Sequence, residues 1–348
     1  MEKVKVLMIG PDRSVHGGIS AVVNNYYDAG IEEKVQLTYI GTMVEGSKLR
    51  KLLQAIHAYI RFCKALPDYP IVHINMASDS SYYRKSFFIR KAKKAGKKII
   101  IHQHGGDFET FYLHQQNDAG RARIQKVLNM ADVFLVLAPP WKEFFGQIVE
   151  KQKILVFPDA ISIPDAFEKE YGKHRILFLG RICREKGVVE LLNVMPELHE
   201  KYPDVKLLLG GIWEDEEIRE QAEHLSEYVT YLGWIDGAGK QDYLTLSDIF
   251  VLPTHFEGQS VAILEGMAYY CAIAASNTGG IPQMIESEKN GLLFEPQNEE
   301  DLRKTLERLL EDAELCKKLG MSGRNTVEKK FAIQNNMNQL VELYHGML

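Results

Sequence analysis

Short runs of Val, Ile and Leu alternate with longer segments of helical periodicity along the whole chain. In the first half, the apolar runs predict strands near residues 3–9, 35–40, 70–75, 98–103, 132–137 and 153–157. Segments with apolar residues at every third or fourth position predict helices near 17–29, 47–65, 82–95, 117–130 and 139–147. Strands that alternate with helices are typical of parallel βαβ units, so we expect an α/β fold.

The second half repeats this alternation. Its predicted strands lie near 175–179, 205–209, 228–232, 248–252, 271–275 and 291–294, and its last predicted helices near 298–312, 322–331 and 333–346. At 348 residues the chain is long for one core, so we expect two Rossmann-like, doubly wound domains, residues 1–165 and 166–332. Residues 158–174 carry turn signals without apolar periodicity and are the expected linker. A ligand site is expected in a cleft between the domains.

The composition is that of a soluble globular protein, with 45% hydrophobic and 26% charged residues. The four cysteines are widely spaced and contain no C-x-x-C pair, which favours reduced thiols in a cytosolic protein. The first apolar run is too short for a signal peptide, and no run approaches the roughly 20 residues that span a bilayer. We therefore expect a cytoplasmic protein.

Two glutamates lie at the carboxyl edge of the second predicted sheet. Glu257 follows the strand near 248–252, and Glu265 lies in the apolar helix that begins near Gly258–Ser260. Ligands bind at this edge of open α/β sheets, helix N-termini attract anions, and carboxylates accept hydrogen bonds from vicinal hydroxyls. Either glutamate alone could be a solvated charge, but Glu265 needs a partner in its apolar helix, and a ribose diol could serve. A sugar nucleotide fits these requirements.

Cations and glycines follow two other predicted strands. Arg181 and Lys186 precede a helix opened by Gly187, and a guanidinium fork with an ammonium suits a diphosphate. A solvated charged turn is the alternative. The Gly17-Gly18 turn after the first strand could let the backbone approach a phosphate, although a plain βα turn is an equal alternative. The dinucleotide fingerprint G-x-G-x-x-G is absent.

Histidines end the predicted strand near 98–103. A histidine there can donate a hydrogen bond or move a proton, and His104 lies further out than His102, so we favour His104. The alternative is one structural and one solvated histidine. The sequence places no third ligand for a metal. The acidic run at 214–217 is interpreted as the first turn of a helix, and the fragment at 237–241 fails the P-loop spacing.

In this order, the motifs resemble the family 4 retaining glycosyltransferases of the GT-B fold. The matching motifs are the Gly17-Gly18 loop, the His104 loop, Gly180-Arg181 with Lys186-Gly187, the E-x7-E pair Glu257/Glu265, the turn Gly279-Gly280-Ile281-Pro282, and Asn290-Gly291. The resemblance implies that Arg181 and Lys186 hold the donor diphosphate, helped by the Gly17-Gly18 backbone. It implies that Glu265 binds the ribose, that Glu257 contacts the donor sugar and that His104 lines the path of the sugar and acceptor. It also places Trp234, Ile235, Gly258, Gln259, Ser260 and Val261 at the donor.

The resemblance further implies a metal-independent hexosyltransferase without a cofactor. Its co-substrate would be a nucleotide-diphosphate sugar, with a UDP-sugar favoured over GDP-mannose. The acceptor would be a saccharide or lipid-linked hydroxyl in capsule, exopolysaccharide or glycolipid biosynthesis, and residues 333–348 would cross back to the first domain. Gln259, Cys271 and Gln283 replace the usual aromatic, Gly and Glu, which leaves the donor sugar open. The alternatives are an epimerase or phosphorylase on this fold, or a non-catalytic nucleotide-sugar or membrane-binding protein.

Charge divides unevenly along the chain. Residues 1–165 hold 23 Lys+Arg and 16 Asp+Glu, a net +7, and the remainder holds 19 and 31, a net −12. Cations interleave with aromatic residues over 82–98, and the helix at 47–64 carries one apolar stripe, Leu49, Leu52, Leu53, Ile56, Ile60 and Cys63. Such a surface can dock on anionic lipids of the inner leaflet; the alternative is that its aromatics pack in the core. Nucleic acid is disfavoured because no recognition motif accompanies the charge.

Overall fold

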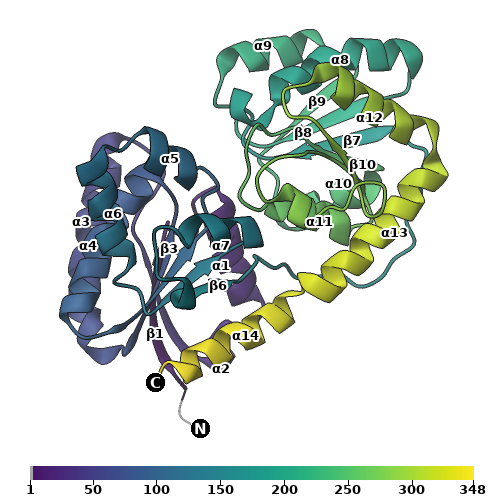
Figure 1. Cartoon of the computed structure of the whole chain (residues 1–348). Helices are drawn as coiled ribbons and strands as arrows, with labels where there is room; N and C mark the ends of the chain where they lie inside the picture. The colour runs from purple at the N-terminus through teal and green to yellow at the C-terminus, as the bar shows by residue number, and fades with distance from the viewer. Residues whose placement is uncertain (1–2) are drawn as a thin grey trace. The chain divides into compact units, whose positions relative to one another are not determined.

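The computed structural model describes residues 3–348, which divide into two compact units (Figure 1). The first unit runs to Ser162 and takes in Ile333–Leu348, and the second is Ile163–Ala332. The chain therefore passes between the units twice. The first passage falls within residues 157–174, which contain neither a helix nor a strand of the sheets.

A parallel sheet of six strands, in the order β2-β1-β3-β4-β5-β6, forms the middle of the first unit. The strands are β1 (Lys5–Gly10), β2 (Gln36–Gly41), β3 (Ile71–Met76), β4 (Lys98–Gln103), β5 (Val133–Val136) and β6 (Ile154–Val156). All six predicted strands are thus present. Every residue of β3 is buried, as expected for a parallel strand with helices on both faces.

The helices of the first unit confirm the five predicted there. They are α1 (Gly18–Asp28), α3 (Lys48–Ala65), α4 (Asp79–Lys94), α6 (Asp118–Leu128) and α7 (Pro139–Phe145). Two helices were not predicted, α2 (Ile31–Lys34) and α5 (Phe108–His114), and short 3₁₀ turns lie at Leu66–Asp68 and Lys151–Lys153. Helices α3, α4 and α6 gather on one side of the sheet (Figure 1). The last helix, α14 (Ile333–Gly346), belongs to this unit and packs against α1.

The second unit is built on another six-stranded parallel sheet, in the order β12-β11-β10-β7-β8-β9. Its strands are β7 (Arg175–Leu179), β8 (Lys206–Gly210), β9 (Val229–Gly233), β10 (Ile249–Leu252), β11 (Ala272–Ser276) and β12 (Leu292–Phe294). Its helices are α8 (Val188–Lys201), α9 (Glu216–His224), α10 (Gly237–Leu246), α11 (Val261–Ala268), α12 (Glu299–Glu311) and α13 (Ala313–Lys330), with 3₁₀ turns at Arg184–Lys186 and Ile281–Gln283. All strands predicted for this half are present.

The helix predicted at 322–331 is too short. The observed α13 begins at Ala313 and continues through Gly320, a residue that weakens intrinsic helical propensity. A Cβ atom on Gly320 would lie 2.1 Å from the carbonyl oxygen of Tyr270, so only glycine allows this close approach. Packing of α13 against α11 and β11 therefore stabilises a helix that local propensity does not predict.

In each sheet the strand order reverses between two neighbouring strands, β1 and β3 in the first unit and β7 and β10 in the second. Ligands of open α/β sheets bind beyond the carboxyl ends of the strands at such a switch point. The Gly17-Gly18 loop follows β1, while the loops with Arg181 and Glu257 follow β7 and β10. The topology thus places these sequence candidates at the two switch points.

Candidate active site

Backbone hydrogen bonds join three loops at the switch point of the second unit. The amide of His255, in the loop after β10, donates to the carbonyl of Glu185 in the loop after β7 at 2.9 Å. The amide of Gly280, in the loop after β11, donates to the carbonyl of Glu257 at 3.0 Å. The three candidate loops therefore form one connected structure.

Gly187 makes the close approach of the first two loops possible. Its φ of +71° lies in the left-handed region, and a Cβ atom there would lie 1.8 Å from the carbonyl oxygen of Pro253. Any other residue would meet both backbone strain and a clash. The glycine that opens α8 thus sets the position of Lys186, which precedes it.

Lys186 and Glu257, predicted from separate motifs, are in contact. The Lys186 Nζ donates to Glu257 Oε2, and the two side chains are only 17% and 20% exposed. An ammonium and a carboxylate are therefore held side by side beyond the ends of β7 and β10. This pair can meet both a phosphate and a sugar hydroxyl.

Glu265 has a partner that sequence reasoning missed. The Nζ of Lys240 donates to Glu265 Oε1 at 2.6 Å, so a ribose diol is not needed to satisfy this carboxylate in the ligand-free protein. Lys240 lies at the start of α10, in the fragment considered only as a failed P-loop. No sequence signal joins Lys240 to Glu265, because the two helices meet only through the tertiary fold.

Arg181 stands apart from the Lys186–Glu257 pair. Its side chain is 51% exposed, and Nη1 donates to Glu214 Oε2 at 2.7 Å. As predicted, the acidic run at 214–217 opens a helix: Asp215 caps α9 by accepting from the amides of Glu217 and Ile218. A diphosphate at Arg181 would therefore compete with Glu214 for the guanidinium.

The remaining donor candidates surround these loops. Trp234 is 45% exposed between β9 and α10, and Ile235 follows it half-buried. Ser260 caps α11 by accepting from the amide of Ile263 at 3.3 Å. Gln259 is buried and Gln283 is exposed, and both differ from the usual family residue.

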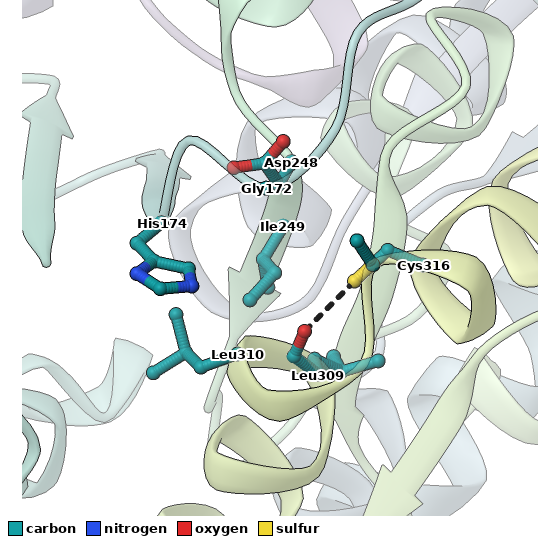
Figure 2. A pocket seen from close by; sticks show the side chains of 8 residues that line it. Gly172, His174, Asp248, Ile249, Leu309, Leu310 and Cys316 are labelled. Carbon is teal, nitrogen blue, oxygen red and sulfur yellow. Dashed lines mark hydrogen bonds between the residues drawn. The ribbon is translucent and has the colours of Figure 1, made fainter. Parts of the chain in front are cut away.

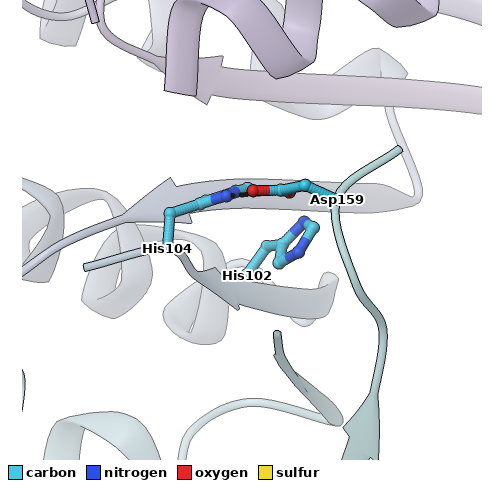
Figure 3. Close-up of side chains that lie close together, drawn as sticks. All are labelled: His102, His104 and Asp159. Atoms are coloured by element: carbon cyan, nitrogen blue, oxygen red, sulfur yellow. Dashed lines mark ion pairs between the residues drawn. The ribbon is translucent and has the colours of Figure 1, made fainter. Parts of the chain in front are cut away.

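In the first unit, His104 is held by two side chains that the sequence analysis did not select. Its Nε2 lies 2.9 Å from Asn75 Oδ1, and its Nδ1 lies 3.3 Å from Asp159 Oδ1 (Figure 3). Asn75 could have been suspected because it lies near the end of β3, beside β4. Asp159 lies far away in sequence, in the linker, and carried no signal. Gly17 and Gly18 open α1, and added Cβ atoms there would meet nothing within 4 Å.

His102, His104 and Asp159 also form the one group of possible metal ligands found among the described residues, with ligand atoms within 4.8 Å of one another. The structure thus supplies the third ligand that the sequence did not. The rings of His102 and His104 are tilted against each other, with centroids 4.0 Å apart and planes at 37°. His104 Nε2 lies 2.9 Å from Asn75 Oδ1, so Nδ1 is the nitrogen of this ring that faces the Asp159 carboxylate.

A small cavity near the opposite end of the second sheet is not a ligand site. His174, Asp248 and Cys316 line it, and Cys316 Sγ donates to the Leu309 carbonyl at 3.1 Å (Figure 2). Its volume of about 10 Å³ has room for at most one water molecule. The Asp248 carboxylate accepts hydrogen bonds from the backbone amides of Lys173 and Arg175, so it stabilises the start of β7.

The chain is similar to known proteins over half of its length or more. Residues 160–326 match the family model "Glycosyl transferases group 1". Spore coat protein SA of Bacillus subtilis is 29% identical over 185 residues, which cover 50% of this chain and about half (49%) of that relative. Phosphatidyl-myo-inositol mannosyltransferase of Mycolicibacterium smegmatis is 25% identical over 290 residues, covering 72% of this chain and 74% of the relative.

Solved structures share the whole fold. Sucrose-phosphate synthase from Thermosynechococcus elongatus superposes with a TM-score of 0.81 at 19% identity, covering 99% of both chains. Anabaena HepE in complex with UDP and glucose gives a TM-score of 0.77 at 13% identity, covering 99% of this chain and all of that one (100%). The fold of two doubly wound α/β units is therefore GT-B, as expected. Residues 160–326 are thus similar to the group 1 glycosyl transferases, and the whole chain has the fold of the solved structures above.

Proposed function

We propose that this protein is a retaining glycosyltransferase that transfers a hexose from a nucleotide-diphosphate sugar to a saccharide or lipid-linked hydroxyl, in capsule, exopolysaccharide or glycolipid biosynthesis. The observation that carries the proposal is the Lys186–Glu257 pair at the switch point of the second unit. Similarity to a chain that binds UDP and glucose favours a UDP-sugar, and similarity to a mannosyltransferase keeps GDP-mannose as the second candidate.

In this proposal the site acts by electrostatics. Cleavage of the anomeric bond puts negative charge on the leaving diphosphate, which Lys186 and Arg181 would stabilise. Glu257 would accept hydrogen bonds from the sugar, and Glu265 from the ribose, as each exchanges its lysine for hydroxyls. Trp234 and Ile235 would meet the base. We propose attack by the acceptor on the same face, without a metal ion.

The first experiment measures hydrolysis and transfer with UDP-glucose, UDP-N-acetylglucosamine and GDP-mannose. We expect Lys186→Ala and Glu257→Ala each to lower turnover by at least 100-fold while the fold stays intact. The matched control is Lys201→Ala, which removes an exposed lysine–glutamate pair of the same unit. Wild-type turnover in Lys186→Ala and Glu257→Ala would refute the site.

The same assay separates the alternative functions. An epimerase would change the donor without releasing nucleotide diphosphate, and a phosphorylase would need inorganic phosphate. A non-catalytic binding protein would bind a nucleotide sugar and never turn it over. Release of UDP or GDP that accelerates with an acceptor is expected only for the transferase.

We further propose that the first unit binds the inner membrane surface peripherally. Helix α3 has two apolar sides: Ala58 and Phe62 pack in the core, whereas the opposite side faces solvent. The exposed residues are Leu49 (66%), Leu52 (57%), Leu53 (58%), Ile56 (50%) and Ile60 (49%). Cys63, predicted as part of this stripe, packs against the core instead.

The neighbouring helix α4 extends this surface. Tyr82, Phe88 and Ile89 are buried, as the core-packing alternative expected, but Tyr83 and Phe87 remain 48% and 63% exposed. Helix α3 carries five lysines and arginines and no acidic residue; α4 carries six and one aspartate. Two copies of this protein could not pair through these helices, because both surfaces are positively charged and would repel each other. An anionic lipid surface instead complements both the positive charge and the exposed apolar stripe. No helix within residues 3–348 is long and apolar enough to cross a bilayer.

A further inference from the structure

Each charged residue of the second unit that is proposed to meet the donor is held by an opposite charge. The pairs are Lys186 with Glu257, Lys240 with Glu265, and Arg181 with Glu214. Under the proposed function, Glu257 and Glu265 exchange their lysines for hydroxyls of the sugar and the ribose. Glu214 has no such exchange, because the donor group placed at Arg181 is the anionic diphosphate. The third pair therefore differs from the other two.

The backbone fixes Glu214 beside the loop that carries Arg181. The amide of Ile182 donates to the carbonyl of Ile212 at 2.9 Å, and the amide of Glu214 donates to the carbonyl of Ile182 at 3.1 Å. Ile182 also forms a parallel bridge with Trp213. The loops after β7 and β8 thus continue the ladder of the sheet beyond the ends of the two strands. Glu214 is held in place by this ladder and not only by its own side chain.

The next arginine of the same loop is already occupied. Arg184 Nε donates to Asp215 Oδ2 at 2.9 Å, and its Nη2 donates to Glu217 Oε2. The other carboxylate oxygen of Asp215 caps α9. If a diphosphate took Arg181, Glu214 would have to compete with two carboxylates for Arg184. Glu214 would then stay next to the bound anion.

The Arg181–Glu214 pair is exposed enough to open when a ligand arrives. The two side chains are 51% and 42% exposed, whereas those of Lys186 and Glu257 are 17% and 20% exposed. An exposed ion pair is weak, and opening one changes an affinity by about fivefold at most. A contact of this strength adjusts the affinity for a nucleotide diphosphate without preventing its binding.

We infer that Glu214 is a positioning residue that competes with the donor diphosphate for Arg181. It holds the guanidinium in the free protein, releases it when a nucleotide diphosphate binds, and takes it back when the product leaves. This inference rests on the proposed function, which places the diphosphate at Arg181. Glu214 thereby lowers the affinity for the donor and for the nucleotide product alike, and it speeds the release of the product.

Calorimetric titration with UDP and GDP tests this role, with uridine and guanosine as the matching ligands without phosphate. For the nucleotide that the wild type binds, Glu214→Gln should raise the affinity about fivefold and change the affinity for its nucleoside less than twofold. Damage to the fold would lower both affinities, so a gain for the nucleotide alone is specific to the charge. Glu214→Asp keeps the carboxylate, and its nucleotide affinity should lie closer to that of the wild type.

A double substitution shows whether Glu214 acts through Arg181. In an Arg181→Ala background, Glu214→Gln should change the nucleotide affinity less than twofold, because no guanidinium is left to compete for. The matched control is Glu223→Gln, which removes the same charge from α9 and opens the exposed Arg219–Glu223 pair at 2.9 Å. It should leave both the nucleotide and the nucleoside affinity unchanged.

Two results would overturn the role of Glu214. The first is an unchanged nucleotide affinity in a Glu214→Gln protein that unfolds at the wild-type temperature. The second is a gain that persists in the Arg181→Ala background, since the carboxylate would then act by direct repulsion of the phosphates. If the wild type binds neither UDP nor GDP, the proposed function fails and this inference fails with it. If it binds one of them and Glu214→Gln binds it no more tightly, only the role of Glu214 fails.

Discussion

The exposed stripe on α3 allows a quantitative test of membrane docking. The change is Leu52→Gln, Leu53→Gln and Ile56→Gln together, in residues that expose 57%, 58% and 50%. Burying a whole leucine or isoleucine is worth about 1.5–3 kcal/mol, so the half still exposed is worth about 1 kcal/mol per residue. The triple variant therefore loses about 3 kcal/mol of membrane binding, close to 100-fold in affinity.

The triple substitution should change the stability of the folded protein very little. Substitutions of exposed residues usually alter stability by about 0.5 kcal/mol or less, and glutamine has nearly the helical propensity of leucine. Thermal unfolding of the variant should therefore match the wild type. Turnover of a nucleotide sugar with a water-soluble acceptor should also be unchanged.

Cosedimentation with vesicles of phosphatidylglycerol and phosphatidylcholine measures the partition coefficient. Binding should weaken as salt rises, because screening acts on the cations of α3 and α4. The control triple is Leu113→Gln, Leu246→Gln and Met321→Gln, which removes apolar residues that are 43%, 50% and 57% exposed elsewhere. Equal vesicle binding by the two triples, or none by the wild type at low salt, would refute the membrane surface.

Three further predictions concern the interior and the site. Gly187→Ala should lower the free energy of unfolding by about 1–3 kcal/mol and donor affinity at least tenfold, because φ at Gly187 is +71° and an added Cβ would lie 1.8 Å from Pro253 O. The control is Gly239→Ala, where an added Cβ meets nothing within 4 Å. Equal stability and donor affinity in the two variants would contradict the role of Gly187. Burial lowers the pKa of His73 from 6.5 to about 3, so between these pH values the unfolded chain binds a proton that the folded chain does not, and the free energy of unfolding should fall as the pH falls from 6.5 towards 3. In chemical denaturation, His73→Gln should reduce the dependence of this free energy on pH by up to about 1.4 kcal/mol per pH unit. An unchanged pH dependence in the variant would contradict the buried neutral state of His73. Chelation with EDTA should leave kcat unchanged, and loss of activity that Zn²⁺ restores would instead make His102, His104 and Asp159 a metal site.

Local patterns predicted most elements, because strand and helix periodicities are read over a few residues. They failed at α13, where Gly320 is required by the Tyr270 carbonyl of a neighbouring segment rather than by its own helix. The candidate loops could be placed because parallel strands bring their carboxyl ends to one edge, which suffices for Lys186 and Glu257.

What the sequence by itself determined is the two-unit α/β fold and the chemistry of the loops that follow β1, β4, β7 and β10. The tertiary structure alone decided which groups meet: Lys240 with Glu265, and Asp159 with His104. It also decided which apolar side of α3 is buried, since Phe62 and Leu53 look alike in a pattern of apolar positions. The physical reason is that periodicity records a preference for burial, whereas partners and faces depend on contacts between segments far apart in the chain.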